Sequence, residues 1–78
     1  MGKRTEAMDL YQKALQTLRE LAVKNPDVYL PDVAITLNNL GVLQKNMNDY
    51  AAALANYTEA LTLYRELAVK NHDVYLHE

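Results

Sequence analysis

Cysteine and serine are missing from this sequence of 78 residues, and with them two of the side chains that act as nucleophiles in enzymes. The absence of cysteine also excludes a disulfide framework and a thiolate zinc site. The remaining alkyl hydroxyl groups belong to threonines, none of which lies near a histidine in the sequence. Only two glycines are present, Gly2 and Gly41, so a glycine-rich loop that holds phosphate cannot form. We therefore expect a protein that is not an enzyme and uses no cofactor.

The chain also lacks an excess of positive charge and a long hydrophobic run. Its formal net charge is −2 and its pI is about 5.6, so it has no long-range attraction for the phosphates of nucleic acids. No apolar stretch approaches the ~20 residues that cross a membrane, and the amphipathic start of the chain differs from a secretion signal. We expect no nucleic-acid partner, no membrane partner and a soluble protein of the cytoplasm.

One cluster with the chemistry of metal ligands lies at the end of the chain. It comprises His72, Asp73, His77 and Glu78. The two histidines are five positions apart, whereas ligands on one face of a helix would be three or four apart. We interpret residues 71–78 as a solvated tail and expect no metal site there.

What the sequence does contain is an internal repeat. Residues 11–32 match residues 57–78 at 14 of 22 positions when one segment is shifted by 46 residues. A period between ~20 and ~50 residues is typical of proteins built from stacked repeats. The sequence therefore predicts a repeat architecture.

The two copies differ where the first has Pro26 and Pro31, because the second has His72 and His77. Proline interrupts a helix and histidine does not. We expect the first copy to bend at Pro26 and the helix of the second copy to continue past Asn71.

Hydrophobic residues make up 50% of the chain and recur at intervals of three and four, which is the spacing of helices with one apolar face. We expect an all-α chain of three helices, at residues 5–24, 32–46 and 49–70. A packed linker at residues 25–31 would join the first two helices. A tight turn at Asn46–Asp49 would join the last two, with Asn48 or Asp49 capping the third helix.

These helices resemble the tetratricopeptide repeat, a helical hairpin of about 34 residues with a Leu-Gly pair in its first helix and an Ala-x3-aromatic pattern in its second. Leu40 and Gly41 match the Leu-Gly pair, and Leu37 stands where the family has tryptophan. Ala53 and Tyr57 match the second helix. The longer period and the phrase "TLNNLG" are similar to the extended repeats of kinesin light chains.

The resemblance implies one full repeat at residues 32–70, preceded at residues 5–24 by the second helix of a partial repeat. Ala7 and Tyr11 supply the Ala-x3-aromatic pattern of that partial repeat. Gln44 departs from the family because it replaces a tyrosine. We expect this substitution to weaken the packing or to place an amide between repeats.

The second and third helices should pack antiparallel, because Gly41 and Ala53 are small enough to let the helix axes approach within ~8–10 Å. Larger residues should fill the space around them. The expected contact residues are Leu37, Leu40, Gly41, Ala53, Leu54 and Tyr57, with Tyr50 beside them.

One face of the second helix is a candidate binding surface. It carries Ile35, Asn38, Asn39, Val42, Lys45 and Asn46, which are spaced as neighbours on one side of a helix. In the family this face lines a groove that holds an extended or helical peptide, so the resemblance implies a protein or peptide partner. Amide side chains suit that role because they both donate and accept hydrogen bonds. The alternative is that these asparagines are only polar surface.

The second functional hypothesis is a structural building block, or a truncated or designed repeat fragment, whose main partner is itself. Apolar faces at both ends of the helix stack would then be covered by another copy. The residues expected to mediate self-association are Leu18, Leu61, Leu63 and Leu67. We expect a homo-oligomer, with a closed dimer favoured over an open chain. Exchange of a terminal helix between subunits, with the linker at residues 25–31 as the hinge, is one route to it.

Overall fold

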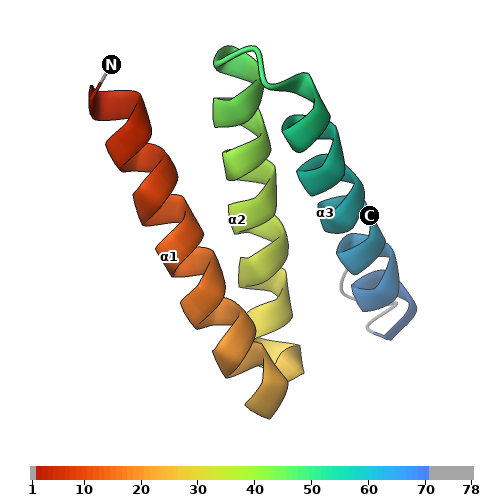
Figure 1. The fold of residues 1–78 in the computed structure, drawn as a ribbon. Helices are drawn as coiled ribbons and strands as arrows, with labels where there is room; N and C mark the ends of the chain where they lie inside the picture. Colours follow the sequence, from red (N-terminus) through yellow and green to blue (C-terminus); the bar gives the residue numbers. More distant parts are fainter. Residues whose placement is uncertain (1, 71–78) are drawn as a thin grey trace.

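The computed structural model describes the backbone of residues 2–70, with side chains from Thr5 onward, and this part of the chain folds into three helices (Figure 1). Their bounds are Gly2–Lys24 for α1, Pro26–Asn46 for α2 and Tyr50–Lys70 for α3. No strand occurs between residues 2 and 70, so the predicted all-α fold is confirmed. The predictions about the tail and about a helix continuing past Asn71 lie outside the described residues.

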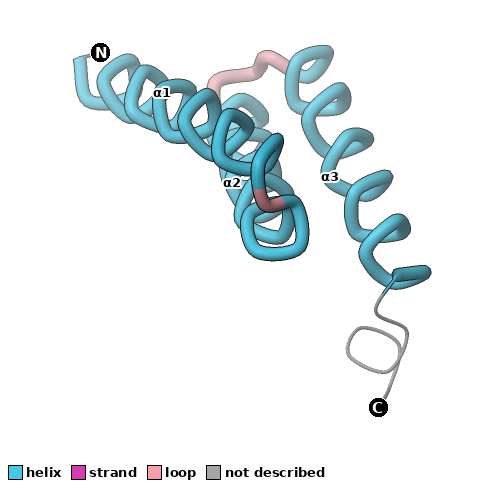
Figure 2. Tube along the Cα trace, turned by 90° about the horizontal axis from the view of Figure 1, so that it is seen from below, coloured by secondary structure: helices cyan, strands magenta, loops and turns pink. Residues whose placement is uncertain are grey.

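Helix α2 lies between α1 and α3, and successive helices run antiparallel (Figure 1). The backbones of α1 and α3 each approach α2 but not one another. Figure 2 shows how short the two junctions between the helices are. The molecule measures 43 × 25 × 19 Å along its principal axes, so its smallest dimension is less than two helix diameters of ~10–12 Å each. Every helix therefore keeps one side in solvent.

The segment expected to be a linker, residues 25–31, is almost entirely helical, because α2 already begins at Pro26. Asn25 is the single non-helical residue between α1 and α2. The chain reverses its direction there, which confirms the expected bend. The Asn25 carbonyl accepts hydrogen bonds at 3.2 and 3.1 Å from the N–H groups three and four residues later. Proline costs little at the first position of a helix, since its missing N–H would have no intrahelical partner there.

Packing accounts for the continuation of α2 through Pro31. This proline lies inside the helix, where its ring removes the hydrogen bond to the carbonyl four residues earlier. Tyr29 and Leu30, directly before it, are partly buried and pack against the hydrophobic core. A helix at this point places both side chains in the core, and their burial offsets the lost hydrogen bond. The prediction of a linker was wrong because it considered the cost of a proline inside a helix but not the burial of Tyr29 and Leu30.

The turn between α2 and α3 has the expected position and contains a helix C-terminal motif. Asn48 has a φ of 65°, and its N–H donates to the Lys45 carbonyl at 3.0 Å. The N–H of Asp49 donates to the Gln44 carbonyl at 2.8 Å, which completes a Schellman motif. The Asp49 carboxylate then accepts from the N–H of Ala52 at 3.4 Å, so Asp49 is the cap of α3.

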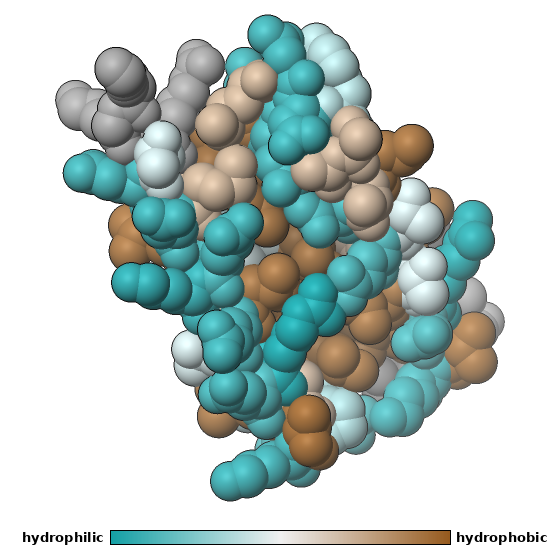
Figure 3. Space-filling model, in the orientation of Figure 1, coloured by the Kyte–Doolittle hydropathy of each residue, from teal (hydrophilic) through white to brown (hydrophobic). Residues whose placement is uncertain are grey.

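The hydrophobic core lies where the three helices meet. Its buried members are Ala22 from α1, Val33 and Leu37 from α2, and Ala60 from α3. Partly buried residues from all three helices surround it, namely Leu15, Leu18, Tyr29, Leu30 and Leu63. In the face that Figure 3 shows, hydrophobic side chains gather in the middle of the molecule and hydrophilic ones cross over them.

Helices α2 and α3 approach closely at Gly41, which confirms its predicted role. A Cβ atom added to Gly41 would lie 2.9 Å from Cε1 of Tyr57, closer than real Cβ contacts allow. Leu37, Leu40 and Ala53, which were expected in the same interface, are buried. The missing side chain of Gly41 is therefore the space that the ring of Tyr57 occupies.

Two residues that were expected in this interface are not there. Leu54 is 66% exposed and Tyr50 is 63% exposed. Leu54 follows the buried Ala53, and each step along a helix turns the side chain by about 100°, so Leu54 points away from α2. Tyr50 is the first residue of α3, and its hydroxyl donates to the Asn48 side chain at 3.0 Å.

Gln44 is buried at 6% exposure and is paired with another amide. Nδ2 of Asn56 donates to Oε1 of Gln44 at 2.6 Å. The amide therefore lies within the hairpin of α2 and α3. This differs from one of the two expectations, which placed it between repeats. Because its oxygen is satisfied, Gln44 avoids the desolvation cost of an unpaired polar group.

Candidate interaction surface

The six residues proposed as a binding surface share one exposed side of α2. Ile35 is 49% exposed and Val42 is 44% exposed, which is unusual for large apolar residues in the central helix. The four polar residues are also exposed, namely Asn38, Asn39, Lys45 and Asn46. The structure therefore brings all six together in solvent, as the helical spacing predicted. Their role as a binding site stays a proposal.

The opposite side of α2 explains why this face is left open. The buried residues of α2 are Val33, Ala34, Leu37, Leu40, Gly41 and Gln44. They recur at intervals of three and four and cover the sides that pack on α1 and α3. Because the central helix is held from two sides, the residues of its exposed side stand on a fixed backbone.

Sequence reasoning missed one member of this surface. Val28 is 53% exposed and precedes Ile35 by seven residues, as Ile35 precedes Val42. Residues seven apart lie on nearly the same side of a helix, so Val28, Ile35 and Val42 form one apolar stripe. Val28 and Val42 are 14 positions apart, which corresponds to about 21 Å at ~1.5 Å per residue. The signal was available in the sequence, but residues 25–31 had been assigned to a linker.

The amides beside the stripe differ from the amide pair inside the hairpin. Among the described residues, neither Asn38 nor Asn39 makes a side-chain hydrogen bond to another side chain or to the backbone. The amides of Gln44 and Asn56, in contrast, bond to each other. Asn38 and Asn39 can therefore donate to and accept from a partner without breaking a contact that the fold needs.

Electrostatically, the surface is weakly positive at one end. Lys45 is the one formally charged residue of the predicted six, and it lies near the C-terminus of α2. A cation there interacts favourably with the helix dipole. A partner with a carboxylate near Lys45 would be favoured at that end.

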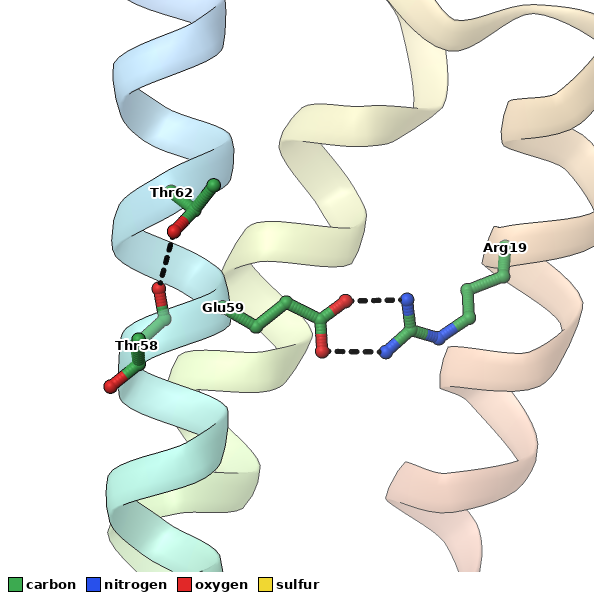
Figure 4. A network of polar contacts seen from close by, with 4 residues as sticks. All are labelled: Arg19, Thr58, Glu59 and Thr62. Carbon is green, nitrogen blue, oxygen red and sulfur yellow. Dashed lines mark hydrogen bonds and ion pairs between the residues drawn. The ribbon is translucent and has the colours of Figure 1, made fainter.

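The opposite side of the molecule contains an ion pair that spans two helices (Figure 4). The guanidinium of Arg19 on α1 donates two hydrogen bonds to the carboxylate of Glu59 on α3, at 2.6 and 2.9 Å. These bonds and the negative charge of Glu59 raise the pKa of Arg19 above its ordinary value, although burial acts in the other direction. Arg19 also borders a cavity of about 280 Å³ lined by Arg19, Ala22, Val23, Leu30, Val33 and Leu63.

The four residues expected to mediate self-association have different environments. Leu61 is 50% exposed and remains available. Leu18 and Leu63 are partly buried and pack against the hydrophobic core. Leu67 is 2% exposed, so its assignment to an open face was wrong. Hydrophobic periodicity identifies the apolar side of α3 but does not tell which part of it α2 covers.

The described residues offer neither a membrane span nor a metal site. None of the three helices is both long enough and apolar enough to cross a membrane. Between residues 2 and 70, no group of three or more histidine, aspartate or glutamate side chains could hold a metal ion. The cluster formed by His72, Asp73, His77 and Glu78 lies outside the described residues.

The comparisons with known proteins agree with the fold. A family model of the tetratricopeptide repeat matches residues 1–66, which is most of the chain. The match is consistent with the variety of repeat found in kinesin light chains. No curated protein and no solved structure matches the chain. On the strength of the family match and the helical hairpin, the chain belongs to the tetratricopeptide-repeat family.

Proposed function

We propose that the chain is a non-enzymatic protein–protein interaction module whose binding surface is the exposed side of α2. Tetratricopeptide repeats generally mediate interactions between proteins. The observation that carries the proposal is the stripe of Val28, Ile35 and Val42, all exposed. Beside it lie the amides of Asn38 and Asn39, which bond to no other group in the described part of the chain. We also propose that α1 is the second helix of a partial repeat and that α2 and α3 form a full repeat.

The chemistry of this surface favours a peptide in an extended conformation. Apolar side chains of the peptide would cover the stripe, while its backbone would bond to the amides of Asn38 and Asn39. At ~3.3 Å per residue, the ~21 Å stripe accommodates about six residues of an extended peptide. Packing on two sides holds α2 in place, so little ordering of the surface would be needed on binding.

Selection from a displayed library of random peptides tests this proposal. Peptides enriched on the wild-type protein should bind the double variant Asn38→Ala, Asn39→Ala at least ~10-fold more weakly, because each lost hydrogen bond is worth ~1 kcal/mol. The matched control is Gln12→Ala, Gln16→Ala, which removes two exposed amides from α1. Equal binding by both double variants, or no enrichment on the wild-type protein, would contradict the proposal.

A second candidate function is assembly with copies of the same chain. It is supported by the exposure of Leu61 at the outer side of α3, and by the partial exposure of Leu18 and Leu63. Leu67 is buried and does not belong to this surface. Residues 25–31 lie mostly in α2, so they do not form the hinge that was expected for helix exchange. Sedimentation equilibrium should show a dimer that Leu61→Asp dissociates. A monomer at all concentrations up to the millimolar range would exclude this candidate.

A further inference from the structure

We propose that the exposed side of α1 binds an amphipathic helix of a partner protein, patterned like α2 but with an apolar residue at the position that corresponds to Gln44. The open face of α1, as we call this surface, consists of Ala7, Leu10, Tyr11, Ala14 and Leu21. It is separate from the exposed side of α2, so the proposal does not depend on the proposed function.

The open face of α1 is hollowed and apolar. Ala7, Leu10, Tyr11 and Ala14 line a groove of about 380 Å³. Leu10 is 67% exposed, and Leu21, two turns beyond Ala14, is 37% exposed. Among the described residues, the backbone of α1 approaches that of α2 alone, and the groove lies outside this contact and outside the ion pair of Arg19 with Glu59.

The internal repeat shows what kind of element fits this groove. A shift of 46 residues places Ala7, Tyr11 and Ala14 on Ala53, Tyr57 and Ala60 of α3, and Leu21 on Leu67. In α3 these positions are covered. Ala53 and Ala60 are 3% exposed, and Leu67 is 2% exposed.

The element that covers them in α3 is α2, since the ring of Tyr57 occupies the space left by Gly41. Tyr11 stands at the position of Tyr57, and no helix of the described residues covers it in this way. A helix that covers α1 in the same manner needs a glycine, or another very small residue, opposite Tyr11. Larger apolar residues should precede it, as Leu37 and Leu40 precede Gly41 in α2.

One difference between the two helices sets the specificity of the groove. Leu10 stands at the position of Asn56, whose amide pairs with Gln44 of α2. Leucine offers no hydrogen bond, so an amide placed opposite Leu10 would be buried without a partner. The helix that fits the groove therefore carries an apolar residue where α2 has Gln44. For the same reason α2 of a second copy of this chain is a poor match, which points to a different protein as the partner.

Fluorescence anisotropy with labelled peptides tests this inference on the full 78-residue chain. The first peptide has the sequence of residues 26–46 with the change Gln44→Leu, and the second has the unaltered sequence. The third carries both Gln44→Leu and Gly41→Leu. The protein variant Leu10→Asp places a charge in the groove. Its matched control is Leu54→Asp, because Leu54 is 66% exposed and Leu10 is 67% exposed. Circular dichroism verifies that both variants keep their helices.

We expect the first peptide to bind the wild-type protein and Leu54→Asp equally, and Leu10→Asp at least ~10-fold more weakly. The second peptide should bind the wild-type protein about 10-fold more weakly than the first, because its glutamine is left unpaired. The third should not bind measurably, because its leucine collides with Tyr11.

Three results with the peptides would overturn the proposal. They are equal binding of the first peptide to Leu10→Asp, equal or tighter binding of the second peptide, and no binding of the first peptide at all. A dimer in sedimentation equilibrium that Leu10→Asp dissociates would identify a second copy as the occupant, and would overturn the choice of a different protein.

Discussion

The contact between Gly41 and Tyr57 limits how closely α2 and α3 approach. A leucine at position 41 would place its Cβ 2.9 Å from the ring of Tyr57, so the ring and the helix would have to shift. We expect Gly41→Leu to lower the free energy of unfolding by about 1–3 kcal/mol, as overpacking in a filled interior does. Urea denaturation measures this, with Val42→Leu on the exposed side of α2 as the control. Equal stability of the two variants would show that the contact does not limit the packing.

The amide pair inside the hairpin of α2 and α3 is the basis of a second prediction about single residues. Replacing Asn56 by leucine leaves the buried oxygen of Gln44 without its donor. We expect Asn56→Leu to be destabilised by about 1–3 kcal/mol, the cost of an unsatisfied buried polar group. The double variant Gln44→Leu, Asn56→Leu should recover most of this loss in urea denaturation, because both partners are then apolar. A double variant that is less stable than the single one would contradict this view of the pair.

Helix α2 contains two prolines at different positions, and their effects on the stability of the helix can be compared. Pro26 is the first residue of the helix, where a missing N–H has no consequence, and Pro31 lies inside it. Pro31→Ala should therefore raise the free energy of unfolding by about 1–3 kcal/mol, and Pro26→Ala should leave it nearly unchanged. Thermal unfolding followed by circular dichroism compares the two variants. Similar effects of both substitutions would mean that position within the helix does not determine the cost of proline.

Helix α2 contains both features that could be predicted from the sequence and features that could not. Periodicity predicted three helices and the exposed positions of the candidate surface, because each depends on residues three or four apart in one helix. The close contact at Gly41 was implied by the small residues that match the tetratricopeptide repeat. The start of α2 was missed because the burial of Tyr29 and Leu30 outweighs the cost of Pro31. For the same reason, the position of Val28 on the exposed side of α2 was missed. The burial of Leu67 was missed because a pattern within one helix does not identify which neighbour covers it.

Across the whole molecule, the ion pair of Arg19 and Glu59 joins two helices whose backbones do not approach each other. Its side chains are 46% and 40% exposed, so we expect Arg19→Gln to cost at most about 1 kcal/mol, and less at high salt. Lys70→Gln removes the single contact between Lys70 and Asp27. The side chains of this pair are more exposed than those of Arg19 and Glu59, so we expect a smaller loss of stability. Unfolding at low and high salt measures both effects. A larger loss in Lys70→Gln would contradict the importance of the two-point contact.

We propose that the exposed side of α2 is the surface through which this molecule binds a partner. Backbone amide chemical shifts of the ¹⁵N-labelled protein, titrated with a peptide from the displayed library, test it most directly. We predict that the largest changes lie along Val28, Ile35, Asn38, Asn39 and Val42. Changes confined to α1 or α3, with the exposed residues of α2 unaffected, would contradict the claim.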